Sequence, residues 1–255
     1  MRRYFFIYIL IALFCSNFIV SPLYAGEIRL VGSSTVALAI KGALERFSEE
    51  NPDIKVKLDV SNSGRGVRAL SGGKADIAMI SAPVQVLKFR IAHIDWDRIN
   101  TLQIAERKIV FITHKDNPVT NLTQPQIYNI LSGRAKSWRA FGGDDEHILV
   151  VSEYASGGIR ATVENTLLEG QYIDAKLARM KNTEKISKMV ENTRYALGLV
   201  TEEMVSDKVN VVKLDEGIYQ PLFLLSRSGH VRAEIEILLD YLQLAFQGGL
   251  EPLND

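Results

Sequence analysis

The chain has 255 residues with 30 basic and 30 acidic side chains, so its formal net charge at pH 7 is zero. This balance argues against nucleic acid or an acidic membrane surface as the partner, because both attract strongly basic proteins. The length is enough for one large domain, or for two modest domains that each have a hydrophobic core.

Residues 1–25 have the pattern of a secretory signal peptide. Arg2 and Arg3 precede a long apolar run that ends at the small residue Ala25. We therefore expect cleavage after Ala25, export to the periplasm and a mature chain with 28 basic and 30 acidic side chains. An uncleaved membrane anchor is the alternative, because the run is nearly long enough to span a bilayer. Cys15 is the only cysteine and lies in this segment, so neither a disulfide nor thiol chemistry is expected in the mature chain.

Predicted strands and helices alternate through the rest of the sequence, which is typical of an α/β fold. In the first half, apolar strands are expected at residues 28–31, 54–60 and 76–81. The helix after the first strand carries apolar residues at helical spacing between Val36 and Phe47. All three strands end in segments that bear hydroxyl side chains.

The second half repeats the order of strand, loop and helix. A strand at 107–117 is expected to leave the first lobe, and Thr123 is expected to cap the helix that follows it. The strand at 148–152 runs into the glycine-rich loop 153–158 and another helix. Further strands are expected at 196–200, which is suited to lead back to the first lobe, and at 209–214 and 221–226. We expect residues 26–107 and 201–255 to form the first lobe and residues 108–200 the second.

Three of the loops have the composition of an anion site. The segments GSSTV, SNSGRG and ASGGIR each precede a predicted helix, whose first N–H groups and positive dipole end attract anions. A single such loop more often only caps its helix. Three of them after three strands predict an anion-binding cleft, because ligands of open sheets bind at the carboxyl ends of the strands.

Enzyme chemistry finds little support in the sequence. Ser71 and Lys74 have the spacing of a penicillin-binding nucleophile, but Gly72 and Gly73 interrupt the helix that such a nucleophile needs, so SGGK predicts a helix end. The histidines have no spacing suited to a metal site or a triad: His93, His114, His147 and His230. We predict no catalytic residue, no metal and no cofactor. A hydrolase acting through Ser71 is kept as a further hypothesis.

Longer segments carry a family resemblance. GSSTV at 32–36, the stretch 47–70, GGKADIAMISAP at 72–83 and the stretch 117–138 resemble the phosphate-binding receptors of bacterial ABC importers, which are type II periplasmic binding proteins. The resemblance covers essentially the whole mature chain. It implies two lobes, each a sheet flanked by helices, with two crossing strands, a ligand cleft between the lobes and hinge closure on binding.

The resemblance also implies contact residues in the first lobe. Ser34 and Thr35 fall on the first contact loop of the family, and Ser63 falls on the second, beside Gly64 and Arg65. Ser81 takes the position after the buried strand. Some members have an aspartate there, which accepts the proton of hydrogen phosphate and excludes fully ionised anions. That discrimination cannot rest on a serine.

The second lobe departs from the family, which has an arginine, a Ser-Gly-Thr triplet and often a second arginine, where this chain has SEYASGGIRATVE. With Arg160 aligned to the second arginine, Gly157 replaces the serine, and Glu153 falls near the missing arginine. With Ser156 aligned to the serine instead, Gly158 replaces the threonine. Either way, the bidentate arginine partner of a phosphate is absent. Arg65 or Arg160 is the candidate to restore the charge.

These observations lead to a main hypothesis and an alternative. The main hypothesis is a monomeric periplasmic receptor that holds phosphate or a related oxyanion and passes it to the membrane subunits of an ABC permease. Backbone N–H groups and the hydroxyls of Thr35, Ser63, Ser81 and Ser156 would hold the anion. The alternative is a receptor-like envelope protein that has lost transport and acts in sensing or partner binding.

Overall fold

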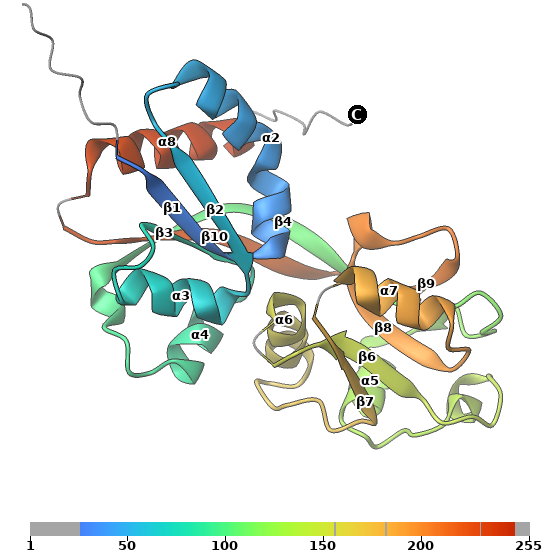
Figure 1. Cartoon of the computed structure of the whole chain (residues 1–255). Coiled ribbons are helices and arrows are strands. Elements are labelled where there is room, and N and C mark those ends of the chain that lie inside the picture. The colour runs from blue at the N-terminus through green and yellow to red at the C-terminus, as the bar shows by residue number, and fades with distance from the viewer. Residues whose placement is uncertain (1–25, 156, 182, 230, 248–255) are drawn as a thin grey trace, which may run out of the picture.

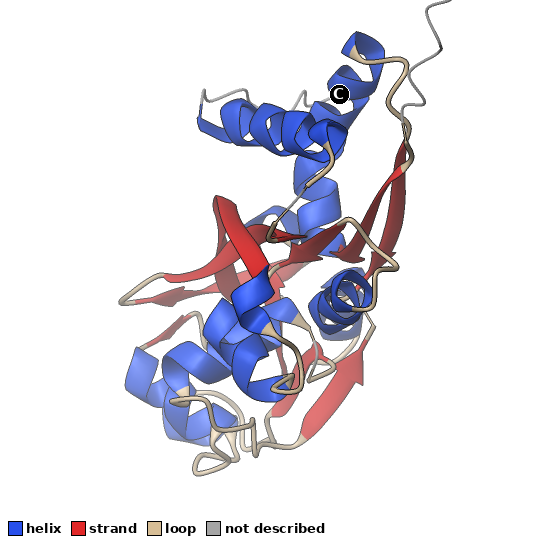
Figure 2. Ribbon diagram, turned by 90° about the vertical axis from the view of Figure 1, so that its left-hand side faces the viewer, coloured by secondary structure: helices blue, strands red, loops and turns tan. Residues whose placement is uncertain are grey.

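The computed structural model describes residues 26–155, 157–181, 183–229 and 231–247. The predicted signal peptide with Cys15, and also Ser156 and His230, lie outside these residues. The described chain forms two lobes that are joined by the long strands β4 and β10 (Figure 1). Helices flank the strands in both lobes, as the turned view in Figure 2 shows. The predicted α/β class with two lobes is therefore confirmed.

The first lobe is a sheet with strand order β2-β1-β3-β10-β4. Strands β1, β2 and β3 are parallel to one another, and β10 runs antiparallel to β3 and β4. Its elements are β1 (Ile28–Ser33), α2 (Ser34–Glu50), β2 (Val56–Ser61), α3 (Ser63–Ser71), β3 (Ile77–Ile80), α4 (Val84–Arg90), η1 (Trp96–Arg98), β4 (Ile99–His114), β10 (Ile218–Arg227) and α8 (Ala233–Gln247). The helices α2 and α8 cover one side with a shared apolar core, which includes Ile40, Phe47 and Leu238.

The second lobe continues the same sheet in the order β4-β8-β6-β7, and β9 pairs with β4 and β5. Its remaining elements are β5 (Asn121–Leu122), α5 (Gln124–Leu131), η2 (Trp138–Phe141), β6 (Leu149–Glu153), α6 (Gly158–Leu167), β7 (Leu177–Met180), α7 (Thr183–Glu191), β8 (Ala196–Thr201), η3 (Glu202–Met204) and β9 (Val209–Leu214). Trp138, which is 2% exposed, packs in the core of this lobe with Phe111 and Ile127.

The predicted return to the first lobe at residue 201 needs a correction. β8 lies between β4 and β6, and β9 pairs with the end of β4 and with β5, so both strands stay in the second lobe. The chain re-enters the first lobe along β10, which pairs with β3 from Phe223 onward. Short apolar strands do not reveal from their sequence which neighbour they pair with, and the hydrogen-bonding partners decide it here.

The carboxyl ends of the parallel strands β1, β2 and β3 lie together at one edge of the first-lobe sheet. β1 and β2 are paired in register so that Ser33 lies opposite Ser61, and β3 ends one residue before Ser81. Helix α2 begins directly after Ser33, and α3 begins after Asn62, which caps it by accepting from the backbone N–H of Arg65. The hydroxyl-bearing loops and two helix N-termini therefore meet at the edge that faces the second lobe.

Candidate functional site

A cavity of about 50 Å³ lies between the two lobes. Its first-lobe wall consists of Ser33, Ser34, Ser61, Asn62, Ser63 and Ser81, and its second-lobe wall of Glu153, Tyr154, Gly157, Gly158 and Lys181. One water molecule needs at least about 10–15 Å³, whereas pockets for organic ligands measure about 300–1,000 Å³. The cavity therefore has the size of a small ion.

Hydrogen bonds tie the hydroxyls of the first-lobe wall together. The Ser33 hydroxyl donates to the Ser81 Oγ at 2.7 Å, and the Ser63 Oγ accepts from the Ser81 backbone N–H at 3.1 Å. Beneath them, the Gln220 side chain on β10 donates to the Ser81 carbonyl oxygen at 2.6 Å. The Ser61 hydroxyl is buried and has no hydrogen-bond partner. This wall is thus fixed in place and still has an unused polar group.

The second-lobe wall is the start of α6, which lies between the lobes in Figure 1. A Cβ atom at Gly158 would collide with the backbone and the hydroxyl of Ser81 in the first lobe. A glycine at this position therefore allows the N-terminus of α6 to come into direct contact with the first lobe.

Glu153 is the acidic group of the cavity. It ends β6, and its Oε2 accepts from the backbone N–H of Ile159 in the first turn of α6, at 3.1 Å. Burial raises the pKa of the Glu153 carboxyl group to about 7, although hydrogen bonds from the backbone N–H groups of Ile159 and Arg160 act in the opposite direction.

The predicted ligand residues fall into separate places. Five of them line the cavity: Ser34, Ser63, Ser81, Gly157 and Gly158. Gly64 is buried in the first turn of α3 and does not line it. Thr35 lines a neighbouring hollow of about 230 Å³ together with Ser34, Thr183 and Thr201. Ser156 lies outside the described residues.

The two arginines predicted to restore the missing charge do not line the cavity. The Arg65 side chain is 64% exposed and pairs with Asp59 on the surface, 3.4 Å away. The Arg160 side chain is 4% exposed and pairs with Glu164 one turn further along α6, at 2.7 Å. Both arginines turn toward carboxylates of their own lobe, a direction that their place at a helix start does not reveal.

Lys181 is the cationic side chain of the cavity wall, among the described residues that line it. It directly follows β7, which pairs with β6 so that Met180 lies opposite Glu153. Lys181 is not among the ligand residues predicted from the sequence, because the four residues of β7 show no clear apolar alternation. Ser33, Ser61 and Asn62 are missed as well, although they belong to the predicted loops.

A buried ion network connects the lobes beside the cavity. Arg90 on α4 of the first lobe donates to Glu164 Oε2 at 2.6 Å and to the Ala155 carbonyl oxygen at 2.7 Å. Its guanidinium also lies 5.1 Å from the ring centre of Tyr172. The Glu164 side chain is fully buried and accepts in addition from Arg160 Nε and the Ile173 N–H. The network joins α4 to the second lobe while the two lobes are in contact, an arrangement that we call closed.

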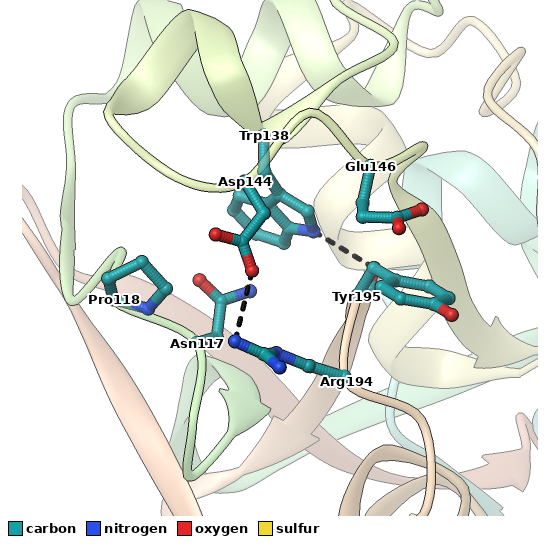
Figure 3. A pocket seen from close by; sticks show the side chains of 7 residues that line it. All are labelled: Asn117, Pro118, Trp138, Asp144, Glu146, Arg194 and Tyr195. Carbon is teal, nitrogen blue, oxygen red and sulfur yellow. Dashed lines mark hydrogen bonds and ion pairs between the residues drawn. The ribbon is translucent and has the colours of Figure 1, made fainter.

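Further hollows of the described residues lie within a single lobe, including one of about 270 Å³ beside His147 and one of about 320 Å³ beside Arg232. A hollow in the second lobe, shown in Figure 3, measures only about 10 Å³. Arg194 pairs with Asp144 across it at 3.1 Å, and Trp138 Nε1 donates to the Tyr195 carbonyl oxygen at 3.0 Å. No cluster of three His, Cys, Asp or Glu side chains suited to a metal occurs in the described part of the chain. None of the described helices is both long and apolar enough to cross a membrane.

The sequence is similar to that of a known protein family. A family model described as a PBP superfamily domain matches residues 21–238. The phosphate-binding protein PstS of Bacillus subtilis (strain 168) is 27% identical over 192 residues, which are 75% of this chain and 62% of that protein. PstS of Staphylococcus epidermidis is 25% identical over 197 residues, which are 75% of this chain and 60% of that protein. The chain thus spans less than two thirds of the length of these relatives.

Solved structures match over most of both chains. A putative phosphate ABC transporter substrate-binding protein with bound phosphate, from Clostridium perfringens, superposes with a TM-score of 0.72 at 23% identity, covering 85% of this chain and 93% of that chain. An ABC-type phosphate transport receptor from Vibrio cholerae gives 0.70 at 23% identity, covering 88% and 98%. This likeness establishes the fold as that of the type II periplasmic binding proteins.

Proposed function

The chain belongs to the PBP superfamily, and from this we propose that it is a solute-binding protein that captures phosphate or a related oxyanion for an ABC importer. The observation that carries the proposal is the cavity of about 50 Å³ between the lobes, where the N-termini of α2, α3 and α6 meet hydroxyl side chains and Lys181. Helix N-termini bind anions because their first N–H groups have no intrahelical acceptor. The names of the relatives support phosphate as the ligand.

The wall of the cavity supplies the donors that such an anion needs. Ser63 Oγ accepts from the Ser81 N–H, so its own O–H is free to donate to a ligand oxygen. The partnerless Ser61 hydroxyl would gain an acceptor from the same ligand. Lys181 would supply the positive charge that the family has in its arginine.

We infer the setting from the same family membership. The protein acts in the periplasm after export, binds as a monomer and hands the anion to the membrane subunits of the permease. It is a binding protein rather than an enzyme.

Isothermal titration of residues 26–255 against phosphate and sulfate, after unfolding and refolding to remove carried ligand, tests the proposal. We expect phosphate binding that Ser63→Ala weakens by about 10- to 150-fold, because a hydrogen bond to a charged group contributes about 1.5–3 kcal/mol. Ser48→Ala is the matched control, since the Ser48 hydroxyl only donates to the Leu44 carbonyl within α2. Absence of heat with both anions would contradict the proposal and favour the partner-binding alternative.

A further inference from the structure

A carboxyl group lies inside the cavity that we assign to an anion. Glu153 lines this cavity, and its Oε2 accepts from the Ile159 N–H at 3.1 Å. That N–H belongs to the first turn of α6, where an oxyanion would find its hydrogen-bond donors. Glu153 therefore occupies part of the place that the ligand needs.

Gly157 leaves room for the carboxyl group in this place. A Cβ atom at residue 157 would collide with the Cβ, the Cδ and the Oε2 of Glu153, so the side chain can fold back against α6 only because residue 157 is glycine. The chain thus has a specific position for the carboxyl group at the helix N-terminus.

Few other titratable groups face Glu153. Lys181 and Tyr154 line the same cavity from the second lobe, and the first-lobe residues that line it are serines and an asparagine. A bound anion would consequently meet one cation and one carboxyl group. If the carboxyl group were ionised, its repulsion of the anion would offset the attraction of Lys181.

The charged groups behind α6 are two arginines and the one carboxylate that they share, so together they carry a net charge of +1. Arg160 and Arg90 both bind Glu164, and the two arginines approach this carboxylate from opposite lobes. Arg90 also donates to the Ala155 carbonyl oxygen, near the loop that carries Glu153 into α6. Neither arginine lines the cavity.

We propose that Glu153 sets the protonation requirement of this cleft: the oxyanion binds together with one proton, which the Glu153 carboxyl group takes from solvent. This inference rests on the proposed function and specifies how that site selects its ligand. The protonated carboxyl group donates its O–H to a ligand oxygen, while its other oxygen keeps the hydrogen bond from the Ile159 N–H.

The direction of the pH dependence follows from this coupling. In the empty cleft burial raises the pKa of Glu153 to about 7, and an anion beside it raises the pKa further. Well below pH 7 the carboxyl group already holds its proton, so affinity does not depend on it. Above pH 7 each unit is expected to weaken binding about tenfold, because the protonated fraction of the free protein falls tenfold.

Titration calorimetry at pH 6 and pH 8 with phosphate and with sulfate tests the proposal. Sulfate is included because its charge, unlike that of phosphate, is constant over this pH range. At pH 8 the measurement is repeated in two buffers of different ionisation enthalpy, which gives the number of protons taken up. The wild type is compared with Glu153→Gln, which keeps an oxygen for the Ile159 N–H and an N–H₂ donor for the ligand. Glu184→Gln is the matched control, because Glu184 lines the neighbouring hollow and not the cavity.

The wild type and Glu184→Gln are expected to take up about one proton more than Glu153→Gln with either anion. At pH 8 Glu153→Gln is expected to bind about tenfold more tightly than the wild type, with the difference largely gone at pH 6. Anion binding with equal proton uptake and equal pH dependence in wild type and Glu153→Gln would overturn the inference and leave the proposed function standing. Absence of binding by all three proteins at both pH values would overturn both.

Discussion

Removal of the Arg90 guanidinium is expected to weaken ligand binding without touching the cavity. Arg90→Met keeps a long apolar side chain but removes the hydrogen bonds to Glu164 and to the Ala155 carbonyl oxygen. Both partners belong to the second lobe, whereas Arg90 ends α4 in the first. These hydrogen bonds form only when the lobes are in contact, so their loss destabilises the closed arrangement.

The size of the effect follows from the network that remains. A hydrogen bond to a charged group contributes about 1.5–3 kcal/mol, and the Arg90 and Glu164 side chains, which are 16% and 0% exposed, are shielded from solvent. Glu164 keeps its bonds from Arg160 and Ile173, so the larger cost of about 3–5 kcal/mol for an unpaired buried charge is not reached. If the free protein is mainly open, phosphate affinity falls by about 10- to 150-fold.

Titration calorimetry measures the affinity, and small-angle scattering with saturating phosphate measures whether the lobes close. Arg98→Met is the control, because the exposed pair of Arg98 with Asp95 lies within the first lobe and such pairs contribute at most about 1 kcal/mol. Equal phosphate affinities for Arg90→Met and the wild type would refute the assignment of this network to the closed arrangement.

Substitutions at three positions of the cleft give further predictions. Gly158→Ala places a methyl group against Ser81 and is expected to hinder closure, lowering phosphate affinity by roughly 5- to 150-fold for about 1–3 kcal/mol of overpacking, as calorimetry would measure. Lys181→Met is expected to lower the affinity at least about tenfold and to reduce its dependence on salt, whereas Lys181→Arg retains both. Glu153→Gln is expected to raise the melting temperature at pH 8 and not at pH 4. Because the pKa of the Glu153 carboxyl group is raised from 4.5 to about 7, its protonation stabilises the fold below pH 4.5, and this stabilisation is lost as the pH rises through 7. Equal shifts of the melting temperature at both pH values would count against this prediction.

Local patterns in the sequence predict the elements of this fold well. Thr123 caps α5 in a capping box with Gln126, and α3 ends at Ser71 with Gly73 in the left-handed region at a φ of 70°. The last helix buries Ile235, Leu238 and Leu242, which recur at helical spacing in the sequence. Caps, glycines and apolar spacing act over a few residues, so a sequence can reveal them without knowledge of the tertiary contacts.

The charges of the site depend instead on contacts between distant segments. Lys181 reaches the cavity because β7 pairs with β6. The short segment 177–180 has no residue pattern that predicts this pairing. Arg65 and Arg160 turn away because Asp59 and Glu164 attract them. Thr35 faces a neighbouring hollow rather than the cavity, since successive helical residues point in directions about 100° apart. The sequence therefore predicts where the loops meet better than which side chains point inward.

The pair of crossing strands has a mechanical consequence. β4 and β10 are hydrogen-bonded to each other from Ile99 to Ile109, through the junction of the lobes, with a shift of register between Leu222 and Phe223. Such a ribbon resists stretching, because extension would break its ladder, but it bends and twists readily at an irregular point. The two halves of the molecule therefore have a preferred axis of rotation and little freedom to slide or separate, so a single angle describes most of their relative motion.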